Sequence, residues 1–173
     1  HNKGELSRII VVDNGSTDDS VAAVEGLSCV EVIHTGENLG FAAACNIGAQ
    51  AGSAPYILFL NPDTRLEEGA LSVPLAFMEQ PENAKVGICG IQLIDEHDKV
   101  SRTCARFPTL RRLVSSALGM DKVPGLYGSG MRMCNWDHKD TRKVDQVMGA
   151  FFFVRREAFE ACGGFDERFF VYF

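Results

Sequence analysis

The sequence lacks close pairs of cysteines. Its six cysteines are separated from one another by at least fifteen positions. Structural zinc sites usually take their ligands in close pairs, so a zinc site is not expected. Most of the cysteines have apolar neighbours, which predicts small core residues of a reduced protein.

The sequence also lacks an apolar run long enough to cross a bilayer, a signal-peptide pattern, and an excess of positive over negative charge. Lysine and arginine number 17 against 23 aspartates and glutamates, for a net charge of −6. This balance argues against a sequence-independent nucleic-acid binder. An anionic ligand would need a metal ion or backbone N–H groups. We therefore expect a cytoplasmic protein that does not bind nucleic acid.

At 173 residues the chain is long enough for one domain with a sizeable core. β-Branched runs alternate with helical patterns in its first half, which predicts an α/β fold with a mainly parallel sheet flanked by helices. The expected strands are 8–12, 29–34, 56–60 and 85–94, and the expected helices are 16–26, 41–51 and 67–79. Beyond residue 95 we expect an edge strand at 99–108, a helix at 109–118, a long loop at 119–143, a strand at 144–154 and a helix at 155–162.

Two of the expected strands end in acidic turns, at Asp13 and at Asn61-Pro62-Asp63. Ligands of open parallel sheets bind beyond the carboxyl ends of the strands, so two neighbouring strands would direct these acids into one crevice. An exposed carboxylate there suits Mg²⁺ or Mn²⁺, which bridge carboxylates to phosphates. Aspartate is also common in turns because it bonds nearby backbone N–H groups, so a purely structural role stays open.

Four motifs carry a resemblance that covers nearly the whole chain: "VVDNGSTDDS", "TGENLGFAAACNIGAQ", "YILFLNPDT" and "VMGAFFFVRREAFEACGGFDERFFVYF". In this order and spacing they resemble the inverting family-2 glycosyltransferases of the GT-A fold, a Rossmann-type sandwich. The similarity is greatest to the rhamnosyltransferase-like branch, in which N-P-D-T stands where other members have D-x-D.

The resemblance implies roles for individual residues. Asp13 would bond the ring N–H of a pyrimidine base, and Asp63 would bind the Mg²⁺ or Mn²⁺ ion that holds the diphosphate. The other residues implied on the nucleotide side are Asn14, Ser16, Asn38, Gly40, Asn46 and Asn61. Gly149 and Ala150 would line the acceptor side. Trp136, in the predicted long loop, would either belong to an acceptor-side lid or cover the core.

The resemblance further implies a division of one domain, residues 1–173, into a nucleotide-sugar half (1–94) and an acceptor half (95–173). The family's catalytic base belongs to a Glu-Asp pair that would come directly after Phe173. We therefore expect a segment truncated at both ends that lacks the base. Asp166 and Glu167, the nearest acids, are predicted to order a turn.

The function implied is transfer of a sugar, such as rhamnose from its dTDP donor, to a hydroxyl of a lipid-linked cell-surface glycan at the inner face of the membrane. Two alternatives stay open: a nucleotidyltransferase, and a non-catalytic module that binds a nucleotide-sugar or a partner protein. Apolar surface left by a missing first strand would favour a homodimer.

Overall fold

The computed structural model describes residues 6–120, 123, 131, 133 and 135–170. Its described residues group into two compact units. The first contains the described residues up to Phe59, together with Arg65–Ile88 and those from Phe153 onward. The second contains Leu60–Thr64 and the described residues of Cys89–Phe152. The units do not follow the expected division at residue 94, because the C-terminal segment groups with the N-terminal one.

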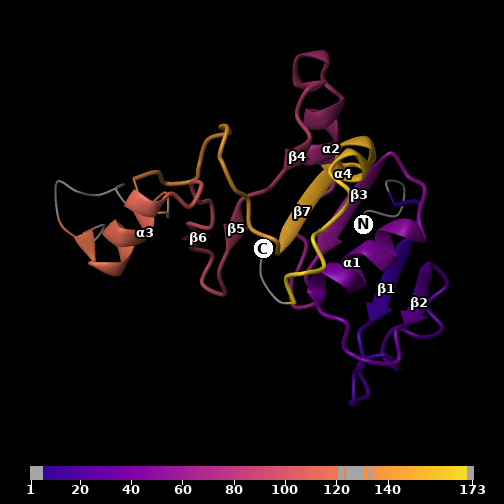
Figure 1. The fold of residues 1–173 in the computed structure, drawn as a ribbon. Coiled ribbons are helices and arrows are strands. Elements are labelled where there is room, and N and C mark those ends of the chain that lie inside the picture. The colour runs from indigo at the N-terminus through magenta and orange to yellow at the C-terminus, as the bar shows by residue number, and fades with distance from the viewer. Residues whose placement is uncertain (1–5, 121–122, 124–130, 132, 134, 171–173) are drawn as a thin grey trace. The chain divides into compact units, whose positions relative to one another are not determined.

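A parallel pair of strands opens the first unit (Figure 1). β1 (Ile9–Asp13) pairs in parallel with β2 (Val30–His34), and Asp13 stands opposite His34. Helix α1 (Phe41–Gln50) packs on β1, and a Cβ added to Gly48 would lie only 3.1 Å from Val12 Cγ2. Small residues on α1 therefore allow a close approach of helix to strand. The helix expected at 16–26 was wrong: this segment forms turns, in which the Asp18 side chain accepts from Ser20 N–H at 3.1 Å.

The second sheet has the strand order β3-β7-β4, formed by β3 (Tyr56–Leu60), β7 (Phe151–Arg155) and β4 (Ile88–Cys89). Arg156 N–H donates to Pro55 O, and Asn61 N–H donates to Ala150 O. These two bonds join opposite ends of the strands, so β3 and β7 run antiparallel. The parallel pairing expected from the alternation is confirmed for β1 and β2. β7 lies beyond the alternating part of the sequence and adds an antiparallel strand.

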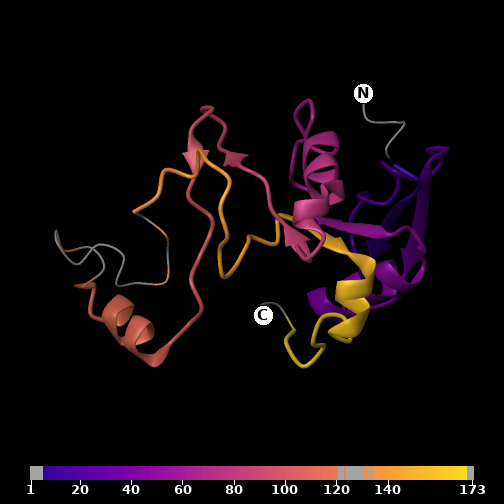
Figure 2. The ribbon, with the colours of Figure 1, turned by 90° about the horizontal axis from the view of Figure 1, so that it is seen from above.

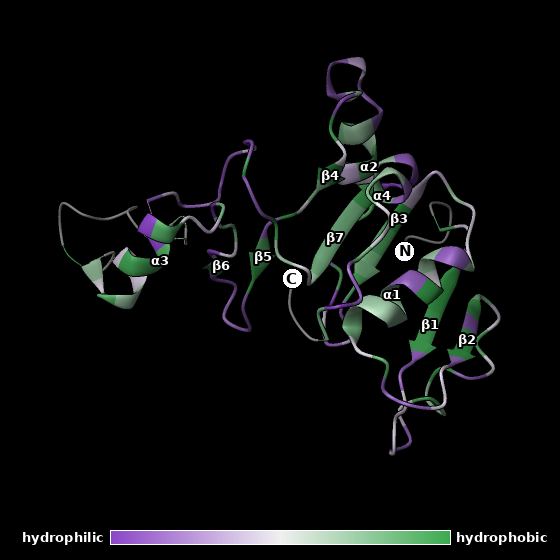
Figure 3. Ribbon diagram, viewed as in Figure 1, coloured by the Kyte–Doolittle hydropathy of each residue, from purple (hydrophilic) through white to green (hydrophobic). Residues whose placement is uncertain are grey.

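Aromatic rings fill the core of the first unit. Phe59 of β3 lies 5.1 Å from Phe159 and 4.9 Å from Phe165, measured between ring centroids. Tyr56 stacks on Phe153 of β7 at 5.1 Å. Figure 3 shows that the strands of this unit are mostly hydrophobic and that many of the loops joining them are hydrophilic. Burial of these large side chains is the main source of stability for such a unit.

The remaining helices and strands are short. Helix α2 (Ser72–Glu79) leads into the single turn η1 (Pro81–Asn83), and helix α4 (Arg156–Ala161) follows β7 directly. In the second unit, β5 (Leu93–Ile94) pairs antiparallel with β6 (Val100–Ser101), and α3 (Leu110–Ala117) begins at the Thr109 cap (Figure 2). The expected strand 85–94 is interrupted between β4 and β5, and most of 144–150 is not strand. The α/β class is confirmed.

None of the helices in the described ranges combines the length and the apolar character needed to span a bilayer. The five described cysteines are free thiols: Cys29 and Cys162 are exposed, and the other three are half-buried. The expectation that most cysteines lie in the core is therefore wrong for these two exposed thiols. Burial raises the pKa of Cys45 to about 11, which keeps that thiol protonated and unreactive.

Candidate functional site

The carboxylate of Asp13 ends β1 with both oxygens engaged. Ser16 N–H donates to Oδ1 at 2.9 Å, and His34 Nδ1 lies 3.0 Å from Oδ2. The hydrogen bonds from Ser16, followed by that of His34, hold the pKa of Asp13 below its usual 3.8. Asp13 is thus an ionised acceptor in a fixed orientation. Its local role in the turn is confirmed, and its contact with a nucleobase stays a prediction.

Asn14 connects the first motif to the second. Its Nδ2 donates to Asn38 Oδ1 at 3.0 Å and to Gly40 O at 3.2 Å, while its Oδ1 accepts from Leu39 N–H at 2.9 Å. Asn38 Oδ1 also accepts from Gly40 N–H at 3.0 Å. We call Asn14, Asn38, Leu39 and Gly40 the amide cluster. Three residues predicted from separate motifs are thereby brought together beyond the carboxyl end of β1.

Gly40 makes the closest approach in this region. Its φ is +89°, and a Cβ there would lie 2.8 Å from Phe170 O. The neighbouring Phe41 N–H donates to the same carbonyl at 2.9 Å. The start of α1 and the C-terminal segment of the described chain therefore meet at a point that only glycine can occupy.

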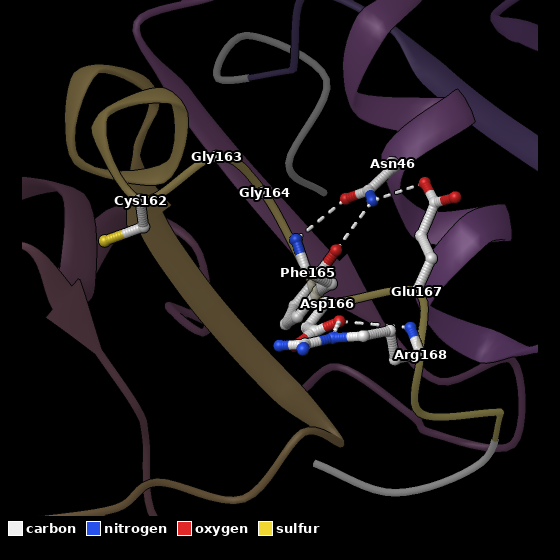
Figure 4. A pocket seen from close by; sticks show the side chains of 8 residues that line it. All are labelled: Asn46, Cys162, Gly163, Gly164, Phe165, Asp166, Glu167 and Arg168. Carbon is white, nitrogen blue, oxygen red and sulfur yellow. Dashed lines mark hydrogen bonds and ion pairs between the residues drawn. The ribbon is translucent and has the colours of Figure 1, made fainter.

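Asn46 lies away from the amide cluster, in a pocket of about 400 Å³ bordered by Cys162–Arg168 (Figure 4). Its Nδ2 donates to Phe165 O at 2.9 Å and to Glu167 Oε1 at 2.8 Å, and its Oδ1 accepts from Phe165 N–H at 2.9 Å. Both hydrogens of this amide are used, so Asn46 anchors the turn after α4. Its predicted contact with a nucleotide stays a prediction that must compete with these bonds.

The two acids of this turn have internal partners. Asp166 accepts from the Arg168 guanidinium, and hydrogen bonds from the Arg168 side chain and backbone lower the pKa of Asp166 to about 2. Glu167 accepts from Asn46. The prediction that Asp166 and Glu167 order a turn is confirmed.

The Asn61-Pro62-Asp63-Thr64 segment forms a turn at the end of β3. Thr64 N–H and Thr64 Oγ1 both donate to Asn61 O, at 3.2 and 2.7 Å. Pro62 occupies the second turn position, where its fixed φ is favourable. Asp63 then stands third in the turn and is exposed.

Asp63 fits a cation ligand by its availability. Within the described ranges its carboxylate makes no hydrogen bond or ion pair, in contrast to Asp13 and Asp166. Magnesium commonly binds through one or two carboxylates, waters and substrate phosphates. A lone carboxylate therefore suits a cation that arrives with a diphosphate, and no group of three or more metal-binding side chains occurs in the described part of the chain.

The acceptor-side segment lies beside this turn. Ala150 O accepts from Asn61 N–H at 3.2 Å, and a Cβ on Gly149 would meet open space. Asn61, Asp63, Gly149 and Ala150 thus belong to one part of the second unit. Asp13 belongs to the first unit and to a different sheet, so a crevice shared with Asp63 stays a prediction.

Trp136 lies elsewhere in the second unit and is only 9% exposed. Its ring stacks on His138 with 4.0 Å between centroids, the Arg142 guanidinium lies 4.5 Å above it, and its Nε1 donates to Asp140. Of the two roles left open by the sequence, the structure supports coverage of the core. A sugar-stacking role for Trp136 is not supported, because the ring is already enclosed.

His34 contacts Asp13 but is not among the site residues predicted from the sequence. The contact depends on the pairing of β1 with β2, whose parallel register places His34 opposite Asp13. The His34 side chain is about half exposed, and its Nε2 lies 3.8 Å from Glu25 Oε1.

Residues 1–163 match the family described as glycosyl transferase family 2. The chain belongs to this family. The match supports the glycosyltransferase interpretation over the nucleotidyltransferase alternative.

Similar curated proteins bear related names. One from Mycobacterium tuberculosis, an N-acetylglucosaminyl-diphospho-decaprenol L-rhamnosyltransferase, is 30% identical over 95% of this chain and 57% of its own length. A pre-mycofactocin glycosyltransferase of the same organism is 31% identical over 92% of this chain and 30% of its own length. The chain thus spans little more than half of the first relative.

Proposed function

We propose that this chain forms the donor-binding part of an inverting glycosyltransferase of the GT-A type. The enzyme transfers a sugar from a nucleoside diphosphate to a hydroxyl of a lipid-linked glycan. Its family membership supports sugar transfer, and the name of the mycobacterial rhamnosyltransferase supports rhamnose as the sugar and a lipid diphosphate as acceptor. A dTDP donor is proposed from the N-P-D-T motif. A lipid-linked acceptor would place the enzyme at the inner face of the membrane.

The observation that carries the proposal is the exposed carboxylate of Asp63, which has no partner among the described residues, in a proline-fixed turn beside Ala150. The turn holds Asp63 without occupying its oxygens, so its charge is available to a cation. Mg²⁺ or Mn²⁺ bound there would neutralise negative charge on the leaving diphosphate. Gly149 leaves open space on the adjoining segment, where an acceptor can approach.

The first unit supplies the base-binding contribution in this proposal. Asp13 is ionised and oriented by Ser16, and it can accept one further hydrogen bond from a pyrimidine ring N–H. Asn14 hydrogen-bonds to Asn38 and Leu39 and thereby fixes the position of the 38–40 loop relative to the end of β1. These residues bind and orient the donor, and none of them transfers a proton.

Calorimetric titration with dTDP and UDP, each with and without Mn²⁺, tests the proposal. We expect Mn²⁺ to tighten binding of at least one nucleotide and Asp63→Ala to weaken the metal-supported affinity by about tenfold or more. In the absence of Mn²⁺ the variant and the parent chain should bind equally. The preferred nucleotide identifies the base of the donor.

Glu82→Ala is the matched control, since Glu82 is an exposed acid in η1 outside both parts of the candidate site. Its metal-supported affinity should equal that of the parent. Unchanged binding by Asp63→Ala in Mn²⁺ would refute the cation role of Asp63. Failure of both nucleotides to bind to folded protein would refute donor binding by this chain.

A further inference from the structure

Helix α3 has its polarity reversed relative to an ordinary surface helix. Its apolar residues Leu110, Leu113 and Val114 recur at the helical spacing i, i+3 and i+4, and Leu118 at the C-cap follows at i+8. Leu110 is 79% exposed and Leu118 is 70% exposed, whereas the polar Ser115 on the other side of the helix is only 5% exposed. Among the described residues, the buried position of α3 therefore lies on its polar side, and its apolar residues are exposed.

The orientation of α3 is fixed at its start. Thr109 Oγ1 accepts from Arg112 N–H at 3.3 Å, and Arg112 Nη1 donates to Phe107 O at 2.9 Å. Phe107 N–H donates to Asp145 Oδ2 at 3.1 Å, while the Phe107 residue is 63% exposed. These bonds cap the first turn of α3 and connect the segment before it to Asp145.

The sequence segment that contains α3 carries charge of the opposite sign to that of the whole chain. Between residues 101 and 120 the sequence contains four arginines and no aspartate or glutamate, although the full chain has a net charge of −6. Arg111 is exposed and makes no ion pair within the described ranges. An apolar face bordered by arginines is typical of helices that lie in the surface of an anionic membrane.

We propose that α3, together with Phe107 and Leu118, is a docking element that inserts its apolar face into an anionic lipid bilayer surface. The leucines would enter the acyl boundary, and Arg111 would contact the lipid phosphates. The inference deepens the proposed function, because it rests on a lipid-linked acceptor for its purpose, but the observations that support it concern α3 itself.

A second copy of the chain is a poorer occupant. Symmetric pairing of the α3 faces would bring two arginine-rich segments together without an acid from the same segment to compensate them. Anionic headgroups supply that compensation and also bury the leucines. Charge complementarity therefore favours lipid.

Co-sedimentation with vesicles tests this inference without nucleotide, so its failure is distinguishable from failure of donor binding. We expect the 173-residue protein to sediment with vesicles of equal parts phosphatidylglycerol and phosphatidylcholine, and not with phosphatidylcholine alone. Raising the salt from about 0.1 M to about 1 M should release most of the bound protein. Leu110→Asn combined with Leu118→Asn should weaken partitioning by about tenfold or more.

Matched variants distinguish binding through this face from non-specific binding through other exposed apolar or basic residues. Leu27→Asn combined with Val73→Asn removes two exposed apolar side chains from the first unit and should leave partitioning unchanged. Arg111→Gln should weaken it by about fivefold, and Lys85→Gln, at an exposed position of the first unit, should not. Circular dichroism checks that each variant is folded.

Absence of sedimentation with anionic vesicles would overturn the proposal. Equal loss in the control variants would also overturn it. Sedimentation velocity gives the remaining outcome: a dimer that the Leu110→Asn, Leu118→Asn variant dissociates, without vesicle binding, would assign this face to a second copy.

Discussion

His34 Nδ1 lies 3.0 Å from Asp13 Oδ2, across the last pair of the parallel β1–β2 ladder. The contact joins the carboxyl ends of two strands that are separated by a turn-rich segment. It holds Oδ2 of Asp13, while Ser16 N–H holds Oδ1. A residue outside the predicted set therefore helps to position a residue within it.

Asp13→Asn should lower the melting temperature in a pH-dependent manner. The folded-state pKa of Asp13 is depressed below 3.8, so its stabilising contribution is complete above about pH 5 and is lost as the pH falls through the folded-state value. Thermal melts of parent and variant should differ most above pH 5 and converge in acid. A constant difference between parent and Asp13→Asn across the pH range would contradict the linkage.

Gly40→Ala should be more destabilising than Gly26→Ala. Both glycines have positive φ, +89° and +86°, but a Cβ at Gly26 would meet nothing within 4 Å whereas one at Gly40 would collide with Phe170 O. We expect a loss of about 1 kcal/mol for Gly26→Ala and about 3 kcal/mol for Gly40→Ala. Urea unfolding measures both, and equal losses would show that the contact between Phe170 and the start of α1 contributes nothing.

Asn46→Ala should destabilise the first unit by about 2–4 kcal/mol, because it leaves backbone groups of Phe165 and the Glu167 carboxylate without their partner. Urea unfolding measures the loss. Asn83→Ala is the control: Asn83 is half-buried, and its side-chain amide bonds only to nearby Phe77 and Gln80, so it should lose less stability. Reduced nucleotide affinity with unchanged stability would instead favour direct nucleotide contact by Asn46.

Trp136 is the only tryptophan, so its fluorescence reports its enclosure directly. At 9% exposure and stacked on His138, it should resist acrylamide quenching in the native protein and become readily quenched in urea. Addition of an acceptor glycan should leave its emission unchanged. Strong native-state quenching would contradict coverage of the core and restore the lid hypothesis.

Local sequence patterns predicted best those strands and helices whose own apolar residues form a continuous run or recur at a regular spacing. The strand at 56–60 was predicted at the bounds that β3 has, and α1 and α3 were predicted within one residue at each end. The helix expected at 16–26 failed because capping residues there bond within turns. The direction of β7 could not be predicted, because strand pairing depends on contacts distant in sequence.

The sequence by itself determined the family, the α/β class, the proline-fixed position of Asp63 and the set of polar residues after β1. These depend on composition, backbone restriction and short-range spacing, which a single chain displays without its fold. Only the tertiary structure decided that Asn14 clamps the 38–40 loop, that Asn46 anchors the 165–167 turn, and that α3 faces outward with its leucines. Those outcomes depend on which side chains meet across long separations, where one hydrogen bond or one missing Cβ selects between arrangements that the sequence pattern permits equally.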